Sequence, residues 1–287
     1  MDKKKKDKIK IGFVGAGRIA HSLVPALIKA GFTVSSVASR ELSSAWHLAK
    51  KNKIKSFSNS AVSAAENCNL IVLSVPDSQI AGTAAEICRA KGLKGKTVLH
   101  LSGSEDISLI RVLRRKGVHT AGLHLLQAFP ERKPVKIAGS YASVEASDEI
   151  TSSLILSIAE DIGLNPFKVK GSEKIIIHMM CVFAANFMNA DYYNANLLYK
   201  KIKSKIPPPE KLLFPLSINN LNNIHKEGVE KSLSGPIARK DYDTVNRHLE
   251  KLFEMSGKEK AFKDLLESYA IQTMNLLKLA GKKRIKK

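Results

Sequence analysis

The chain has 287 residues, of which 44% are hydrophobic, so it can form one large or two ordinary domains with a sizeable core, and global disorder is excluded. The formal net charge is +21, but the ten-residue segments at the two ends supply 10 of these charges. No basic stripe interleaved with aromatic residues runs through the interior. This distribution argues against a dedicated nucleic-acid-binding protein, because charge alone does not define a binding site.

The sequence also argues against a membrane or metal protein. No apolar run reaches the roughly 18 residues that a membrane span needs, since residues 175–188 are interrupted by His178 and Asn186. The basic N-terminus leads into a strand-like run without a small-residue cleavage site, unlike a secretory signal. The three cysteines are far apart and lack metal-type spacing. We therefore expect a cytoplasmic protein with reduced thiols and no metal.

The first half of the chain alternates strand-like and helix-like segments. Apolar runs predict strands at residues 8–14, 33–38, 70–75, 97–101, 120–123, 141–145 and 166–169. Helical spacing predicts helices at residues 18–30, 41–52, 78–90, 106–115 and 149–162. This alternation is typical of a parallel, doubly wound α/β sheet with right-handed crossovers. We predict a Rossmann domain over residues 1–170.

The pattern becomes helical after residue 170. One long helix is predicted over residues 172–199, and others around 209–225, 241–255 and 258–280. Residues 175–188 are apolar nearly all round, and such a helix is normally buried. We predict an all-α domain for substrate binding or dimerisation over residues 171–287.

A glycine-rich turn follows the first predicted strand. It supplies the candidate cofactor-binding residues Gly15, Ala16, Gly17, Arg18 and Ile19 in a G-x-G-x-x-A pattern. The strand before it and the helix after it are the context that a dinucleotide-binding turn requires. Gly15 allows the tight turn, Gly17 lets the pyrophosphate approach the backbone, and the helix N-terminus faces the anion. The alternative is a strand–helix turn that binds nothing.

The end of the second predicted strand distinguishes NADP from NAD. An NAD enzyme usually places an acidic residue there for the ribose 2′-hydroxyl, whereas this chain has Ser39 and Arg40. A hydroxyl and a guanidinium suit a 2′-phosphate. The sequence therefore predicts NADP(H), unless Arg40 is an ordinary solvated residue.

The following strand ends add further candidates, because ligands of such sheets bind at the carboxyl ends of the strands. Val75 and Pro76 follow one strand, and Ser102 and Gly103 follow the next, as further candidate cofactor contacts. His124 and Gln127 come after the strand at 120–123, where either side chain can hold a substrate carbonyl or carboxylate. For His124 the alternative is a hydrogen bond to a backbone carbonyl.

Polar residues on the helical half complete the candidate site. Lys174 and His178 are four residues apart and share a helix face, and Asn186 lies two turns further on. A catalytic constellation or plain buried hydrogen bonds would satisfy them equally well. Arg239 can reach an anionic substrate, or it can belong to a loop in which Asp241 caps the next helix.

Several longer motifs point to a known family. They are IGFVGAGRIA, the ASR ending at Arg40, SVPDSQI, VLHLSGS, GLHLLQAF, the IHMMCVFAAN run ending at Asn186, and LSGPIARKDYDTVNRHL. With these, the chain resembles the Rossmann-like predicted oxidoreductases whose second domain is a helical domain of unknown function. That family belongs to the 6-phosphogluconate dehydrogenase and pyrroline-5-carboxylate reductase superfamily. Two residue types depart from its usual pattern: Leu125 stands for proline, and Met179 and Met180 stand for small residues.

The resemblance implies an NADP-linked oxidoreductase that dimerises through its helical domain and has an active site between its domains. It matches His124, Gln127, His178, Asn186 and Arg239 to motif positions of the family.

The leading hypothesis is therefore hydride transfer from NADPH to a small carbonyl or imine, with a 2-oxo acid such as ketopantoate as one candidate substrate. We expect His178 or His124 to donate the proton, Asn186 to orient the substrate, and Arg239 or Lys174 to hold a carboxylate, with Gln127 as a further substrate contact. The rival hypothesis is a module that senses NADP(H) and performs no chemistry, because no residue is an unmistakable nucleophile.

Overall fold

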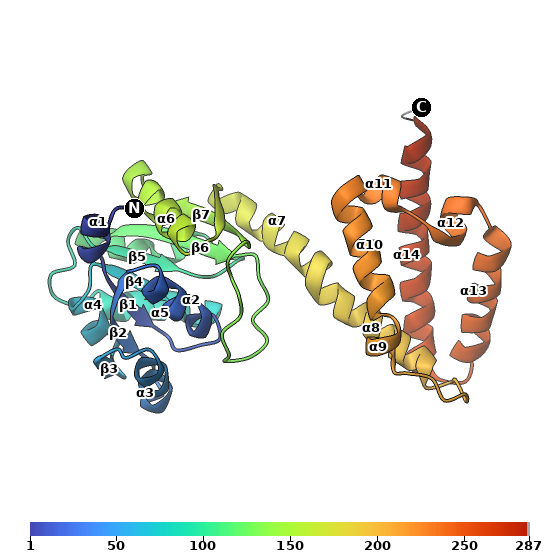
Figure 1. Ribbon diagram of the computed structural model, residues 1–287, viewed down its shortest axis with the longest axis horizontal. Coiled ribbons are helices and arrows are strands. Elements are labelled where there is room, and N and C mark those ends of the chain that lie inside the picture. Colours follow the sequence, from blue (N-terminus) through green and yellow to red (C-terminus); the bar gives the residue numbers. More distant parts are fainter. Residues whose placement is uncertain (286–287) are drawn as a thin grey trace. The chain divides into compact units, whose positions relative to one another are not determined.

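The computed structural model describes residues 1–285. Its chain divides into two compact units, Met1–Ala184 and Ala185–Lys287, which are described separately below (Figure 1). The division falls inside a π-helical turn, η2 (Val182–Asn186). It differs from the expected boundary after residue 170 because α7 (Gly171–Cys181) packs with the sheet of the first unit.

Eight strands of the described chain form one sheet in the order β3-β2-β1-β4-β5-β6-β7-β8. The strands are β1 (Lys10–Val14), β2 (Thr33–Ala38), β3 (Ser56–Ser58), β4 (Leu70–Leu73), β5 (Thr97–His100), β6 (His119–Leu125), β7 (Tyr141–Ala146) and β8 (Asn165–Lys168). β1 to β6 are mutually parallel. The strand order reverses between β1 and β4, and a crevice for ligands forms at such a point of a Rossmann sheet.

Helices cover both faces of this sheet. They are α1 (Lys3–Asp7), α2 (Ala20–Lys29), α3 (Leu42–Lys51), α4 (Ala61–Glu66), α5 (Asp77–Ile87), the 3₁₀ helix η1 (Ile107–Lys116) and α6 (Glu149–Asp161). Side chains alternate along the strands, so Leu70 and Val72 of β4 join the core under α2, α3 and α6, whereas Ile71 and Leu73 join the core under α4, α5 and η1. The predicted doubly wound α/β fold is confirmed.

Two features of the first unit differ from the prediction. β7 pairs with β6 in an antiparallel direction, not in parallel. Parallel neighbours need a crossover, usually a helix, but residues 126–140 between these strands contain none. At the other end, the lysine-rich N-terminus forms the unexpected helix α1, and the Met1 amine and Lys6 both contact the Asp161 carboxylate, at 3.0 and 3.2 Å.

The second unit is helical, as predicted. Its helices are α8 (Phe187–Tyr199), α9 (Pro209–Leu212), α10 (Phe214–Glu227), α11 (Val229–Ser232), α12 (Gly235–Arg239), α13 (Tyr242–Ser256) and α14 (Lys260–Ile285). A small core joins α13 to α14 through Leu252, Phe262 and Leu265. The loop expected before Asp241 contains the short helix α12, and Asp241 caps α13 by accepting a hydrogen bond from the Thr244 N–H at 3.1 Å.

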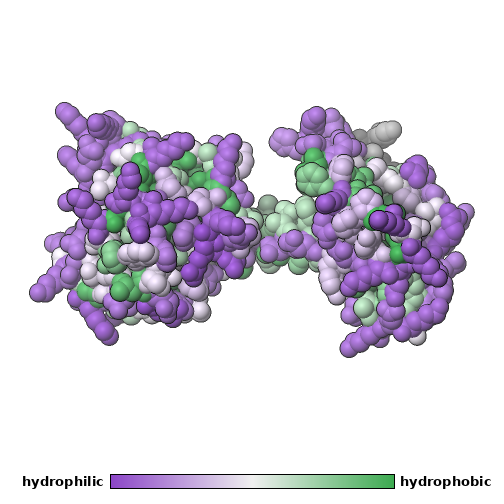
Figure 2. Space-filling model, turned by 60° about the horizontal axis from the view of Figure 1, so that its bottom comes forward, coloured by the Kyte–Doolittle hydropathy of each residue, from purple (hydrophilic) through white to green (hydrophobic). Residues whose placement is uncertain are grey.

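The apolar helix at residues 175–188 is not buried within the chain, contrary to the prediction. Ile176, Met180 and Phe183 are 54%, 63% and 72% exposed, and Figure 2 shows apolar colouring at the surface of the segment that joins the two units. By length and composition alone, the helical stretch Gly171–Tyr199 is apolar enough to cross a membrane.

Candidate cofactor cleft and active site

The glycine turn joins three strand ends. After β1, the Gly15 N–H donates to the Ala38 carbonyl at 2.7 Å, and the Ser74 N–H donates to the Val14 carbonyl at 2.7 Å. Gly15 has φ +108°, and a Cβ on it would stand 2.1 Å from the Ser74 carbonyl oxygen. Only glycine fits there. No side chain caps the N-terminus of α2, so its free N–H groups can receive an anion.

A cleft of two adjoining cavities runs along the carboxyl ends of the strands. One, of about 280 Å³, is lined by predicted residues Gly15, Ala16, Gly17, Ser39 and Arg40, together with Val75 and Pro76. The other, of about 440 Å³, is lined by Arg18, Ile19 and Ser102. Both share Gly17, Ser74, Val75 and Pro76, so the cleft is continuous. Its glycine turn and its arginine at one end fit a phosphorylated dinucleotide.

Sequence reasoning missed several lining residues of this cleft, and two of them come from a loop that is distant in the sequence. Phe129 lines the cavity beside Ser102, and Arg132 lines the cavity beside Arg40. Both belong to residues 126–140, which carry no regular element. Composition shows that a loop contains an arginine or a phenylalanine, but periodicity has no signal for where such a loop lies.

Two histidines meet at the end of β5. His124, from β6, and His178, from α7, have ring centroids 5.7 Å apart. A Cβ on Gly103 would stand 2.6 Å from His124 Nε2 and 2.6 Å from His178 Cδ2, so the glycine gives both rings room. Burial, with the neighbouring His178 and Lys174, lowers the pKa of His124 to about 4. His124 is therefore neutral at pH 7, and its buried Nδ1 has no hydrogen-bond partner among the described residues.

A charged group lies buried beneath α7. Lys174 has no exposed surface, and its Nζ is 3.9 Å from Glu145 Oε2 on β7. The Nζ would stand 2.8 Å from a Cβ on Gly122, so the glycine makes space for the ammonium. Burial lowers the pKa of Lys174, against the opposing charge of Glu145. His100 of β5 pairs with Gly122 across the sheet. Its own burial and the charge of Lys174 lower its pKa to about 4.

The other predicted site residues belong to other elements of the chain. The Gln127 amide donates to the Lys136 carbonyl at 3.3 Å and to Ser140 Oγ at 3.4 Å, so it is engaged within its own loop. Asn186 and Arg239 are exposed residues of the second unit. Within residues 1–285, no group of three or more His, Cys, Asp or Glu side chains is arranged to hold a metal ion.

Two family models match the chain. Residues 10–102 match the family described as coenzyme F420-dependent NADP oxidoreductases, and residues 140–273 match a domain of unknown function, DUF2520. No curated protein matches the sequence. The chain thus combines a Rossmann-like domain of the NADP oxidoreductase class with a DUF2520 domain, which confirms the resemblance noted from its motifs.

Solved structures with similar folds cover nearly the whole chain. A Bacteroides fragilis protein provisionally described as an NADP oxidoreductase is 23% identical, with a TM-score of 0.78 over 95% of this chain and 99% of its own. A pyrroline-5-carboxylate reductase from Coxiella burnetii has 16% identity and a TM-score of 0.59, covering 94% and 99%. A reductive aminase from Aspergillus terreus in complex with NADPH has 13% identity and a TM-score of 0.65, covering 94% of both chains. The prediction that the cofactor is NADP(H) is confirmed by the match to an NADP oxidoreductase family.

The buried lysine generates a testable prediction about the histidines. Lys174→Met removes a positive charge close to His124 and His100, so the pKa of each should rise from about 4 toward its ordinary value. Histidine NMR titration measures both values. Lys170→Met, which changes an exposed lysine at the start of the same helix, is the matched control and should leave them unchanged. Identical titrations in wild type and Lys174→Met would show that no charged ammonium lies beside these rings.

Proposed function

We propose that the protein is an NADPH-dependent reductase of a small imine or carbonyl compound. The observation that carries this proposal is the His124–His178 pair, which meets at Gly103 directly after Ser102 of the cleft. When bound, NADPH supplies the hydride for the carbon atom of the C=N or C=O bond. The names of the similar pyrroline-5-carboxylate reductase and reductive aminase favour an imine. A 2-oxo acid such as ketopantoate is the carbonyl candidate.

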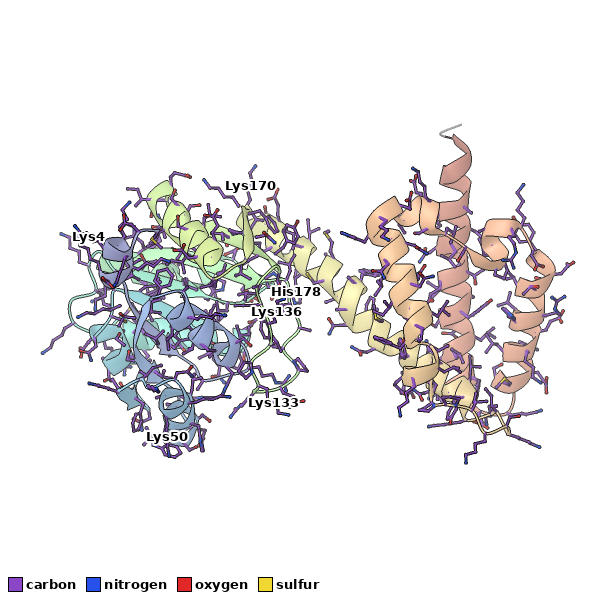
Figure 3. All side chains as sticks on the ribbon, in the orientation of Figure 1. Lys4, Lys50, Lys133, Lys136, Lys170 and His178 are labelled. Carbon is purple, nitrogen blue, oxygen red and sulfur yellow. The ribbon has the colours of Figure 1, made fainter. Side chains whose placement is uncertain are left out.

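The two histidines have different roles in this proposal. His178 is half-buried in the last turn of α7 and donates the proton to the substrate nitrogen or oxygen (Figure 3). His124, neutral because burial lowers its pKa to about 4, holds that atom by a hydrogen bond. Lys174 has no exposed surface, so in this proposal it does not hold a substrate carboxylate. It acts from the interior, where its charge adds to the effect of burial and lowers the pKa of His124.

The remaining candidates act on the substrate from other elements. Asn186 orients the substrate, and Arg239 holds its carboxylate if it carries one. Gln127 supports the loop that contains it and borders the substrate. We place the reaction in the cytoplasm, because the three cysteines are free thiols.

Removal of His178 tests the reductase. In His178→Ala, turnover of an imine and 2-oxo acid panel should fall about 100-fold or more, because a general acid contributes about 10²–10⁴ to the rate. The dissociation constant of NADPH should stay within about twofold. His119→Ala is the matched control, since His119 begins the strand on which His124 lies, at the end of that strand away from the cleft. Wild type that binds NADPH but consumes none with any substrate would favour a non-catalytic sensor.

Arg40→Asp tests the cofactor preference. A carboxylate at this position repels a 2′-phosphate and can bind a ribose 2′-hydroxyl, so NADPH affinity should fall about 100-fold while NADH affinity rises. Fluorescence titration of both nucleotides measures the change. Lys50→Asp on α3 makes the same charge change outside the cleft lining and should preserve the preference. An unaltered NADPH/NADH ratio in Arg40→Asp would remove Arg40 from the phosphate site.

The protein also acts as a homodimer in this proposal, with the apolar face of α7 and α8 covered by a second copy. The support is the exposure of Ile176 and Met180 and the further exposed apolar residues of the helical unit, such as Leu216 and Ile271. Apolar patches of this kind are rare on monomers.

Sedimentation equilibrium tests the dimer with a pair of matched variants. Wild type should be a dimer at micromolar concentration, and Ile176→Lys should shift it toward monomer by placing a charge in the apolar face. Ile150→Lys, at a residue 84% exposed on α6, should remain a dimer. A monomeric wild type contradicts the proposal, and a wild type that needs detergent to stay in solution would point to a membrane instead.

A further inference from the structure

The loop between β6 and β7, residues 126–140, is fastened across the edge of the sheet that carries the cleft; we call it the strap (Figure 1). The Val135 N–H donates to Ser22 Oγ on α2 at 3.0 Å, and Arg132 Nη1 donates to Ser44 Oγ on α3 at 3.2 Å. Ile137 is buried in the core beneath α2 and α6. These contacts hold the strap against α2, which follows the glycine turn, and against α3, which follows β2.

The strap contributes one side chain to each of the two cavities. Phe129 lies in the cavity with Ile19 and Ser102, at the end near the histidine pair. Arg132 lies in the cavity with Ser39 and Arg40, at the opposite end. A single loop therefore borders both ends of the dinucleotide cleft.

The charges around the Arg40 cavity show why a second cation matters. The charged lining residues are Arg40, Arg132, Glu41 and Glu86. With Arg40 alone, two carboxylates would face one guanidinium, and the lining would repel a phosphate. Neither arginine has an ion-pair partner among residues 1–285, so both guanidinium groups keep N–H donors for an incoming anion. Arg132 itself is solvent-exposed, so a ligand can reach it.

We propose that Arg132 binds the 2′-phosphate of NADP(H) opposite Arg40, and that the strap thereby covers the bound cofactor. Two guanidinium groups approaching from different elements can each donate in a fork to the phosphate oxygens. Glu41 and Glu86 repel a phosphate, so the second guanidinium is what balances their two charges in this cavity. The proposal rests on the NADP(H) assignment and not on the reaction, so it stands or falls with binding alone.

The experiment is a titration of NADPH and NADH into wild type, Arg132→Ala and Arg132→Lys. Arg132→Ala should weaken NADPH binding about 10- to 100-fold, the range for losing a charged hydrogen bond, and leave NADH binding within about twofold. Arg132→Lys should recover part of the loss because it keeps the charge without the fork. Adenosine 2′,5′-bisphosphate against adenosine 5′-monophosphate, the two fragments that differ only in this phosphate, should show the same contrast.

Lys133→Ala is the matched control, because Lys133 is the next residue of the strap (Figure 3), pairs with Glu131 at 2.7 Å and does not line the cleft. It should bind both nucleotides as wild type does. Equal weakening of NADPH and NADH in Arg132→Ala overturns the proposal in favour of a strap that only covers the cleft. Unchanged affinities overturn it in favour of a solvated arginine. If wild type binds neither nucleotide, the cofactor assignment fails, and Arg132 fails with it.

Discussion

The contact between Gly15 and the Ser74 carbonyl determines where a ligand can bind. Because a side chain at Gly15 would stand 2.1 Å from that oxygen, the end of β1 lies against the end of β4 with nothing between them. The strand order reverses at this pair, so α2 and α5 leave it in different directions and open the cleft. The uncapped N-terminus of α2 then faces the cleft as its main source of backbone donors.

The buried ammonium of Lys174 is the second constraint on the site. β5, β6 and β7 place His100, Gly122 and Glu145 side by side across the sheet, and the missing side chain of Gly122 is what admits the lysine. With Lys174 fixed, the next turn of α7 brings His178 beside His124. A buried charge costs several kcal/mol unless it is paired, and an apolar side chain would fill this space without that cost. Glu145 offsets part of this cost, and the lysine charge also contributes to the lowered pKa of both histidines.

The sequence predicted the parts of the site that depend on local pattern. The glycine turn, Ser39 and Arg40 line one cavity. They could be predicted because the motif and the strand end are each recognised from consecutive residues. The helical half and the doubly wound sheet followed from periodicity in the same way. What escaped prediction depends on pairing between distant segments. The path of residues 126–140 across the sheet determines both the antiparallel direction of β7 and the position of Arg132 in the cavity. The burial of Lys174 depends on the missing side chain of Gly122, which is 52 positions earlier in the sequence.

The two ends of the cleft meet opposite electrostatic requirements. The phosphate end has the exposed cations Arg40 and Arg132, and the other end has His124, whose pKa is lowered to about 4 by burial. Residues 126–140 connect these ends, because they carry Arg132 at one and Phe129 at the other. Binding energy gained on a non-reacting phosphate can therefore hold in place the loop that borders the reacting end. When binding energy from a non-reacting group positions the reacting end, it raises the rate of the chemical step as well as the affinity for the cofactor.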